Sequence, residues 1–280
     1  MKKISRRSFL AAAGLSVAAL ALTACGGSSS SVASSVASSA AASSEAASTS
    51  AAAGELTTVE AGKLTMATNA TFPPYEMTTD AGDIEGIDVE TAQAIADKLG
   101  LELQIDDMDF DAALLSVQQG KADIVMAGVT VTDERKAVMD FSDSYATGIQ
   151  SIIVPEGSDI ASPDDLAGKK IGTQRGTTGS IYCSDDFGDD AVVAYDNCLP
   201  AVQALNNGQV DAVVIDNAPA KEYVAANPGL AILDTSYAEE DYAIGMAKGS
   251  SLEAAVNAAL EELKADGTLQ SIVDKYITAE

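Results

Sequence analysis

The chain is 280 residues long and strongly acidic, with a formal net charge of −26 at pH 7, and it contains no histidine. A field of that sign repels phosphate backbones and anionic lipid surfaces, which argues against nucleic-acid binding. Without histidine, the chain has neither a Ser-His-Asp nor a Cys-His nucleophile system, and zinc sites with histidine ligands are also excluded. We therefore expect no metal and no cofactor.

Residues 1–24 have the pattern of an export signal. Basic residues at positions 2, 3, 6 and 7 precede an apolar stretch, 9–22, that is too short to span a bilayer as a stable anchor. The run SRRSFL at 5–10 resembles a twin-arginine export motif, and an ordinary secretion signal with paired arginines is the alternative. We expect an extracytoplasmic protein.

The segment after this signal has the pattern of a lipid anchor and a tether. Residues 22–25 (LTAC) resemble a bacterial lipobox, in which the cysteine, here Cys25, is lipidated and becomes the first residue of the mature chain. Residues 26–55 are almost entirely Ser, Ala and Gly, and such a segment has too little apolar bulk to offset its ordering entropy. We expect 25–55 to be a flexible linker that holds the protein at the cell membrane without crossing it.

Residues 56–280 alternate short β-branched runs with helical patterns, which is typical of an α/β fold with parallel-rich sheets flanked by helices. The predicted strands are 63–67, 101–105, 123–127, 151–154, 170–173, 191–195, 212–215 and 242–247. The predicted helices are 89–99, 111–119, 133–139, 200–206, 219–226, 252–265 and 269–276. Asp88 is in the position of a helix N-cap, and Gly100, Gly120 and Gly208 are in C-cap positions.

The pattern of elements occurs twice. GKLTM at 62–66 opens the first half, and GKKIG at 168–172 opens the second. Each half then reaches a helix that stops at a glycine, Gly120 or Gly208, before an apolar strand led by aspartate. Two similar α/β lobes explain this repeat more simply than one sheet does.

Four stretches carry a resemblance to a known family. In chain order they are TNATFPPYE at 68–76, GIDVE at 86–90, TVTDER at 130–135 and GTTG at 176–179. Together they resemble the periplasmic-type solute-binding proteins for polar amino acids. The resemblance implies a two-lobed type II fold, with lobe 1 at 56–150 plus 242–280 and lobe 2 at 151–241. It also implies a two-strand hinge near 148–154 and 238–242, and a monomer that binds a free amino acid and delivers it to an ABC permease and its ATPase.

A cleft that closes on an amino acid needs a fixed cation, a fixed anion and several backbone donors, because burying either ligand charge unpaired costs several kcal/mol. Arginine suits bidentate carboxylate binding, and Arg135 follows a predicted strand at the edge where ligands bind in open α/β sheets. By the resemblance, Arg135 grips the ligand α-carboxylate. Gly128 and Thr130 fill the turn before its helix and offer backbone groups and a hydroxyl, or serve only as turn and cap.

From lobe 2, Thr177 and Thr178 lie in a Gly-rich turn that leads into a helix and can offer N–H groups to an anion. The resemblance implies that this turn meets the same carboxylate. Asp216 ends a predicted strand and either caps the next helix or, by the resemblance, takes the ligand ammonium. Both roles can coexist on its two oxygens.

Aromatic residues are the predicted walls for the ligand side chain. By the resemblance, Phe72 stacks on the ligand, Phe110 is either a wall or core, and Tyr75 belongs to the core. Asn69 stands where many relatives carry aspartate, which weakens the case for a strictly cationic ligand. Arg175 either reaches the cleft or, by default, points into water.

Two questions stay open at this level. Cys183 and Cys198 form an even pair in an exported chain, so they are either joined in a disulfide or two separate small hydrophobic residues. Some relatives of the fold are cyclohexadienyl-dehydratase-like enzymes, and in such an enzyme Glu76 would have to supply the acid or base. A sensory protein that docks on a receptor is the other alternative, but we expect a carrier and no enzyme.

Overall fold

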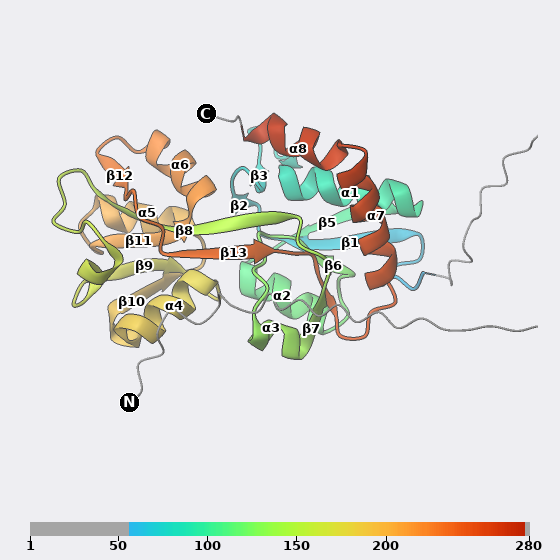
Figure 1. The fold of residues 1–280 in the computed structure, drawn as a ribbon, viewed down its shortest axis with the longest axis horizontal. Helices are drawn as coiled ribbons and strands as arrows, with labels where there is room; N and C mark the ends of the chain where they lie inside the picture. The colour runs from blue at the N-terminus through green and yellow to red at the C-terminus, as the bar shows by residue number, and fades with distance from the viewer. Residues whose placement is uncertain (1–55, 278–280) are drawn as a thin grey trace, which may run out of the picture. The chain divides into compact units, whose positions relative to one another are not determined.

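The computed structural model describes residues 56–277, which belong to one compact unit (Figure 1). The predicted signal peptide, Cys25 and the 25–55 linker lie outside the described residues. None of the helices within 56–277 has the length and apolarity needed to cross a membrane. The described part contains two larger sheets, which we call sheet 1 and sheet 2, and one small sheet.

Sheet 1 has five strands, and its first two pairings are parallel because a helix crosses over between each pair of successive strands. In spatial order the strands are β5 (Glu102–Asp107), β1 (Lys63–Thr68), β6 (Ile124–Val125), β14 (Gly245–Ala247) and β7 (Met139–Phe141). Its helices are α1 (Ile87–Leu99), α2 (Phe110–Gln118), α3 (Asp133–Val138), α7 (Glu253–Ala265) and α8 (Thr268–Tyr276).

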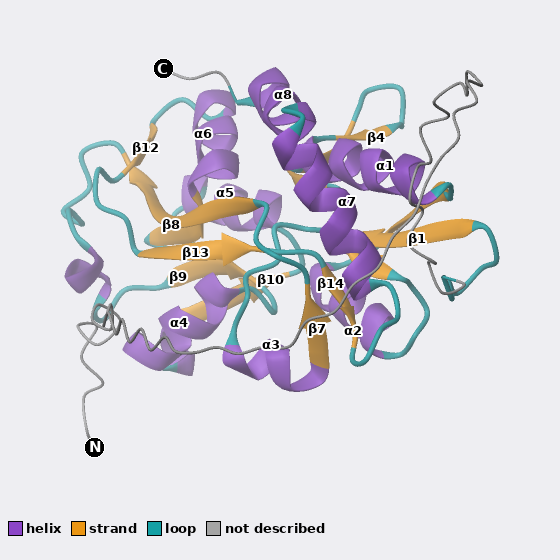
Figure 2. Cartoon of the chain, turned by 45° about the vertical axis from the view of Figure 1, so that its right-hand side comes forward, coloured by secondary structure: helices purple, strands orange, loops and turns teal. Residues whose placement is uncertain are grey.

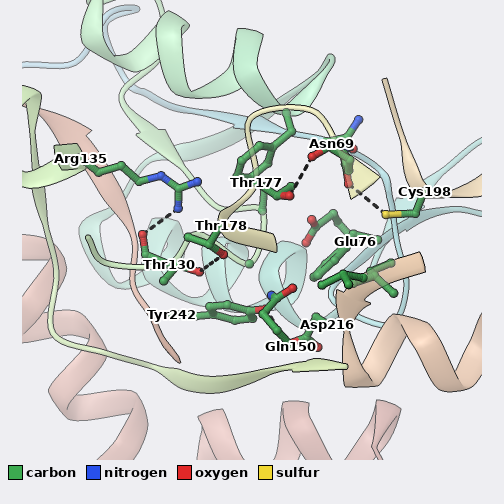
Figure 3. Close-up of a pocket in the computed structure, with 17 residues that line it drawn as sticks. Asn69, Glu76, Thr130, Arg135, Gln150, Thr177, Thr178, Cys198, Asp216 and Tyr242 are labelled. Carbon is green, nitrogen blue, oxygen red and sulfur yellow. Dashed lines mark hydrogen bonds between the residues drawn. The ribbon is translucent and has the colours of Figure 1, made fainter. Parts of the chain in front are cut away.

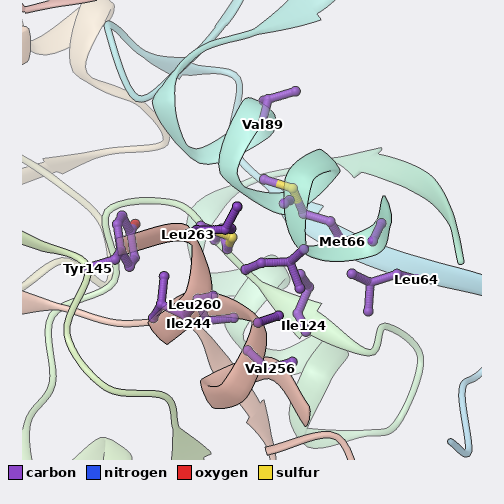
Figure 4. Close-up of a cluster of buried hydrophobic side chains, with 14 of the residues drawn as sticks. Leu64, Met66, Val89, Ile124, Tyr145, Ile244, Val256, Leu260 and Leu263 are labelled. Carbon is purple, nitrogen blue, oxygen red and sulfur yellow. The ribbon is translucent and has the colours of Figure 1, made fainter. Parts of the chain in front are cut away.

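Alternation along the strands of sheet 1 divides its core into two clusters. Met66 and Ile124 pack with α1, α7 and α8, while their neighbours Ala67 and Val125 pack with α2. Figure 1 shows the same division, with α1, α7 and α8 on one side of the sheet and α2 on the other. Figure 4 shows the larger cluster, in which Leu64, Met66 and Ile124 are fully buried. Burying each such side chain stabilises the fold by about 1.5–3 kcal/mol.

Sheet 2 has six strands and repeats this plan. Its strands are β10 (Val192–Tyr195), β9 (Ile171–Gln174), β11 (Ala212–Asp216), β8 (Ala146–Pro155), β12 (Leu230–Ile232) and β13 (Ala238–Tyr242), the last paired to β8. Its helices are α4 (Thr178–Phe187), α5 (Cys198–Asn206) and α6 (Asn217–Ala226), with short 3₁₀ turns at Pro163–Leu166 and Asp189–Ala191.

The disulfide between Cys183 and Cys198 does not form, because the two residues lie on opposite faces of sheet 2. Cys183 packs in a cluster with Ile152 and Val214, whereas Cys198 packs in a cluster with Ile153 and Val213. Successive residues of a strand point to opposite faces, so the sheet itself separates the two sulfurs. Both cysteines are free and buried, and the hydrophobic alternative is correct.

The strands β8 and β13, ten and five residues long, pair antiparallel in sheet 2, and at the ends near Ala146 and Tyr242 the chain crosses to sheet 1 (Figure 2); we call them the crossing strands. Their register pairs Ala146 with Tyr242 and Gln150 with Ala238. The one strand predicted at 242–247 is wrong in this respect, because β13 ends at Tyr242 in sheet 2 and β14 starts at Gly245 in sheet 1.

Gly148 is required where these strands meet, because a Cβ atom there would lie 2.4 Å from the Tyr242 ring.

Several local predictions are corrected by the structure. The N-cap of α1 is Gly86, and Asp88 lies inside the first turn, where its buried carboxylate accepts a hydrogen bond from the Gly128 N–H. The sequence analysis also missed the small sheet formed by β2 (Thr71–Phe72), β3 (Glu76–Thr78) and β4 (Ile84–Glu85). Its short strands carry little periodicity, yet they position Phe72 and Glu76.

Candidate functional site

A pocket lies between the two sheets, beside the crossing strands (Figure 3). It encloses about 440 Å³ of space free of atoms, a figure that includes open solvent at its mouth. All nine residues predicted to bind ligand line it, namely Asn69, Phe72, Phe110, Gly128, Thr130, Arg135, Thr177, Thr178 and Asp216. Figure 3 shows Arg135 at one side of the pocket and Asn69 and Cys198 at the other.

Arg135 is a buried cation whose partners are carbonyl groups. It begins on α3, whose N-cap Thr132 accepts a hydrogen bond from the Arg135 N–H, and its side chain is only 8% exposed. Its Nη1 donates to the Thr130 carbonyl at 2.8 Å and its Nη2 to the Gly176 carbonyl at 3.1 Å, one from each side of the pocket. The guanidinium also lies 5.4 Å from the centre of the Phe110 ring.

The structure shows no ion pair between Arg135 and any described residue. Burial lowers the pKa of the guanidinium from its ordinary value. A guanidinium has five N–H donors, so donors remain for an anion in the pocket.

Asp216 is a buried anion at the end of β11. Its Oδ1 accepts from the Ala218 N–H at 3.0 Å, which caps α6 as the sequence allows. Its Oδ2 accepts from the Ile149 N–H at 2.8 Å and from the Tyr242 hydroxyl at 2.7 Å. Burial raises the pKa of Asp216 to about 6, and the hydrogen bonds from Tyr242 and the two amides oppose that rise. A cation in the pocket would favour its ionised form.

Two loops surround the space between Arg135 and Asp216. Gly128 has a φ of +55°, and a Cβ atom there would lie 2.8 Å from the Phe72 ring, so the loop needs glycine. Thr177 caps α4 by accepting from the Ser180 N–H, and its hydroxyl donates to the Gln174 carbonyl. The N-terminus of α4 therefore faces the pocket, where it carries a partial positive charge.

Three aromatic residues, Phe72, Phe110 and Tyr242, line the pocket. Phe72 stacks on Tyr75 with ring centres 5.8 Å apart, and Tyr75 meets Tyr242 edge-on at 5.5 Å. Tyr75 itself is buried in the core of sheet 1, whereas Phe110 both packs in the core and lines the pocket.

The side of the pocket opposite Arg135 is formed by neutral groups that we call the amide end: Asn69, Gln174 and Cys198. The Gln174 Nε2 donates to the Asn69 Oδ1 at 2.9 Å, and the Cys198 thiol donates to the Gln174 Oε1 at 3.2 Å. The Asn69 Nδ2 donates to the Met108 carbonyl at 2.9 Å. Each donor atom of the amide end, namely the Asn69 Nδ2, the Gln174 Nε2 and the Cys198 Sγ, thus donates to at least one protein acceptor.

Glu76 lies beside the amide end and differs from every other polar group of the pocket. Its side chain is fully buried, and neither carboxyl oxygen accepts a hydrogen bond from a described residue. Burial and the nearby Asp88 carboxylate raise the pKa of Glu76 well above its ordinary value. With a proton on Glu76, its carboxyl can donate to Asp88, so the empty pocket favours the neutral acid.

Sequence reasoning missed Gln150, Gln174, Cys198 and Tyr242 as lining residues and considered Glu76 only as a catalytic acid. Gln174 lies two residues before the Gly-rich turn at 176–179, so a search extended upstream by two residues would have found it. Arg175 lies on the surface, where its Nη2 meets Asp196 at 3.4 Å and its side chain is 53% exposed. The default expectation for Arg175 is therefore correct.

Comparison with known proteins gives a consistent result. The sequence profile of the bacterial extracellular solute-binding proteins, family 3, matches residues 64–279. A probable histidine-binding protein of Neisseria gonorrhoeae is 33% identical over 279 residues, covering 96% of this chain and 95% of its own length.

Among solved structures, an ancestral arginine-binding protein bound to glutamine is 43% identical, with a TM-score of 0.74, and the match covers 78% of this chain and 99% of that one. The arginine-, lysine-, histidine-binding protein ArtJ of Geobacillus stearothermophilus is 35% identical, also with a TM-score of 0.74, over 78% of this chain and 96% of its own. The expected two-lobed type II fold is thereby confirmed. All three of these relatives are binding proteins, so they give the dehydratase alternative no support.

Proposed function

The chain belongs to the bacterial extracellular solute-binding proteins, family 3, and on that premise we propose that it captures an amino acid for an ABC importer. The observation that carries the proposal is a buried cation and a buried anion, Arg135 and Asp216, which line the same pocket. An α-amino acid carries one charge of each sign and would pair with both. Buried charges that are paired in this way avoid the large cost of isolated ones.

The ligand α-carboxylate binds the remaining guanidinium donors of Arg135 and the backbone N–H groups of the α4 N-terminus at Thr177 and Thr178. The α-ammonium binds Asp216 and the loop at Gly128 and Thr130. The ligand side chain then extends between Phe72 and Phe110 toward the amide end. This orientation is supported by the positions of Arg135 and Asn69 at opposite sides of the pocket in Figure 3.

The far end of the pocket selects a side chain that ends in N–H donors. The donor atoms of Asn69, Gln174 and Cys198 each donate to at least one acceptor within the protein, while both oxygens of Glu76 lack a donor among the described residues. A guanidinium is the best match, because it supplies several donors and a charge that offsets an ionised Glu76. Arginine is therefore the proposed ligand, with glutamine next, because its amide NH₂ also donates.

This assignment revises the expectation from sequence. Asn69 is neutral where many relatives carry aspartate, which argued against a strictly cationic ligand. Glu76 returns a carboxylate from a different strand, β3. The relatives support the revision, since one is named for arginine, lysine and histidine and another is an arginine-binding protein bound to glutamine.

Capture requires the lobes predicted at 56–150 plus 242–280 and at 151–241 to close on the ligand. The strands β8 and β13 are the hinge in this proposal, and the permease recognises the closed form before its ATPase drives transport. The protein works as a monomer held at the membrane by a lipidated Cys25, after export through the signal at 1–24. Metabolic labelling with a fatty acid tests this anchor, since wild type should incorporate label and Cys25→Ser should not.

Calorimetric titration of the full-length protein in detergent with the twenty amino acids tests the function. The proposal predicts tight binding of arginine, weaker binding of glutamine and a raised melting temperature with either. Silence across the panel, after unfolding and refolding to remove retained ligand, would exclude a free amino acid as the solute.

A further inference from the structure

A buried carboxylate lies on the crossing strands, behind the residues that line the pocket. Glu240 lies on β13 with only 7% of its surface exposed. Its Oε2 accepts three hydrogen bonds, from the Thr178 hydroxyl at 2.9 Å, the Thr130 hydroxyl at 3.0 Å and the Gln150 Nε2 at 3.1 Å. Its Oε1 has no hydrogen-bond partner among the described residues.

The three donors come from different parts of the fold. Thr130 lies on the loop after β6 of sheet 1, Thr178 begins α4 beside sheet 2, and Gln150 belongs to β8. One oxygen of Glu240, on β13, therefore accepts hydrogen bonds from both sides of the pocket and from the neighbouring strand β8. All three donor residues line the pocket, whereas Glu240 stands behind them.

The number of hydroxyl protons decides what these threonines can offer a ligand. Each hydroxyl has one proton, and both protons are directed at Glu240. The two hydroxyl oxygens also lie 3.4 Å apart, but donation to a carboxylate is stronger than donation between neutral hydroxyls. Toward the pocket, Thr130 and Thr178 therefore present lone pairs and act only as acceptors.

We propose that Glu240 is a positioning residue that makes the pocket selective for an ammonium group by fixing both threonine hydroxyls as acceptors. This inference rests on the proposed function, namely that an α-amino acid occupies the pocket. An ammonium donates to these oxygens, whereas an α-hydroxyl in its place can donate only one proton and carries no charge. The donors of Glu240 lie on both sides of the pocket. Both threonine hydroxyls are therefore fixed as acceptors only when the two sides of the pocket are close to each other.

The test replaces Glu240 by glutamine and measures discrimination rather than affinity alone. A glutamine at this position keeps the shape, but it offers the three donors a neutral amide oxygen, which is a weaker acceptor than a carboxylate and lets the hydroxyl protons turn toward the ligand. The probes are L-arginine and its α-hydroxy analogue, L-argininic acid, titrated by calorimetry into the full-length protein. Glu239→Gln is the matched control, because Glu239 adjoins Glu240 on β13 and is exposed.

We expect E240Q to lose about tenfold or more in affinity for arginine, as for one charge-assisted hydrogen bond, and much less for argininic acid. Thr130→Val should show the same loss of discrimination between the two probes. The double variant, E240Q with Thr130→Val, should lose little more arginine affinity than either single variant, because each of the three variants removes the same interaction. Thermal unfolding without ligand shows whether each variant is folded. Glu239→Gln should match wild type for both probes.

Three results would overturn the inference while leaving the proposed function intact. They are equal losses for the two probes in E240Q, no loss for either probe, and additive losses in the double variant with Thr130→Val. A wild-type protein that binds no amino acid would instead overturn the proposed function and this inference with it.

Discussion

The two ends of the pocket are built in opposite ways. At one end, Arg135 is held by two carbonyl groups, and between the ends Asp216 accepts three hydrogen bonds. At the amide end, neutral side chains satisfy one another, and the buried Glu76 carboxyl has no donor among the described residues. The first end is fixed before the ligand arrives and suits any α-amino acid. At the second end the Glu76 carboxyl lacks a hydrogen-bond donor, so this end selects a ligand side chain that can donate.

Arg135→Ala should cause the largest effect, because it removes the pocket's cation. We expect every amino acid that binds wild type to lose about a hundredfold or more in affinity, which corresponds to two charge-assisted hydrogen bonds. Calorimetric titration measures the loss. Arg175→Ala is the matched control, since that arginine is exposed at the surface and should leave binding unchanged. Retained affinity in Arg135→Ala would mean that the carboxylate binds elsewhere.

Glu76→Gln should separate the two ends. Arginine should lose about tenfold to a hundredfold in affinity, because its guanidinium loses a charged acceptor, while glutamine should change by less than about threefold. Competition between the two ligands in one calorimeter run gives the ratio directly. Glu85→Gln is the control, because Glu85 is exposed on the adjacent strand of the same small sheet. Equal losses for both ligands would remove Glu76 from the specificity account.

Arginine affinity should fall by about tenfold between about pH 7.5 and about pH 5 as Asp216 takes up a proton. Burial raises the pKa of Asp216 to about 6 and that of Glu76 well above its ordinary value, whereas the bound ammonium and guanidinium favour the ionised forms. Binding near pH 6 should therefore release protons, which titrations in two buffers with different ionisation enthalpies detect. Affinity that does not change with pH would contradict this assignment.

The raised pKa of Asp216 makes the stability of the ligand-free protein depend on pH in the opposite direction from arginine binding. Because the pKa of Asp216 is higher in the empty folded protein than in the unfolded chain, its contribution to stability is present at low pH and is lost as the pH rises through about 6. The ligand-free protein thus becomes less stable from this group in the same pH range in which it becomes better at binding. Asp216→Asn should remove the contribution of this residue to the pH dependence of arginine affinity and to the pH dependence of stability.

Cys198→Ala should have the smallest effect on the pocket. It removes one weak S–H donor from Gln174 at the amide end, and we expect about a twofold to threefold loss of arginine affinity. Cys183→Ala is the control, since that cysteine is buried on the other face of sheet 2 and should lower only the stability. Neither variant, nor a reducing agent added to wild type, should show the large loss of melting temperature that breaking a disulfide causes.

The sequence predicted the first end of the pocket better than the second. Asp216 ends β11, and Thr130 and Arg135 lie on the loop and the helix α3 that follow β6, so the order of elements alone decides their location. Gln174 and Cys198 come together only because β9 and α5 pack side by side, and Glu76 depends on strands of two or three residues. Periodicity cannot detect such short strands.

The errors have related causes. Asp88 has the sequence context of an N-cap, but a tertiary contact with the Gly128 N–H determines its role. The strand expected at 242–247 is split because its two halves pair in different sheets. Glu240 gave no signal at all, since an acidic residue in a hinge strand is usually solvated, and its partners arrive from both sides of the pocket.

A crystal structure of the protein with L-arginine is the most direct test of the central claim. The account predicts the α-carboxylate on Arg135, the α-ammonium on Asp216 with the Thr130 hydroxyl as acceptor, and guanidinium nitrogens within hydrogen-bond distance of the Glu76 carboxylate. An arginine bound in the reverse direction, or a guanidinium that leaves both Glu76 oxygens without a donor, would contradict it.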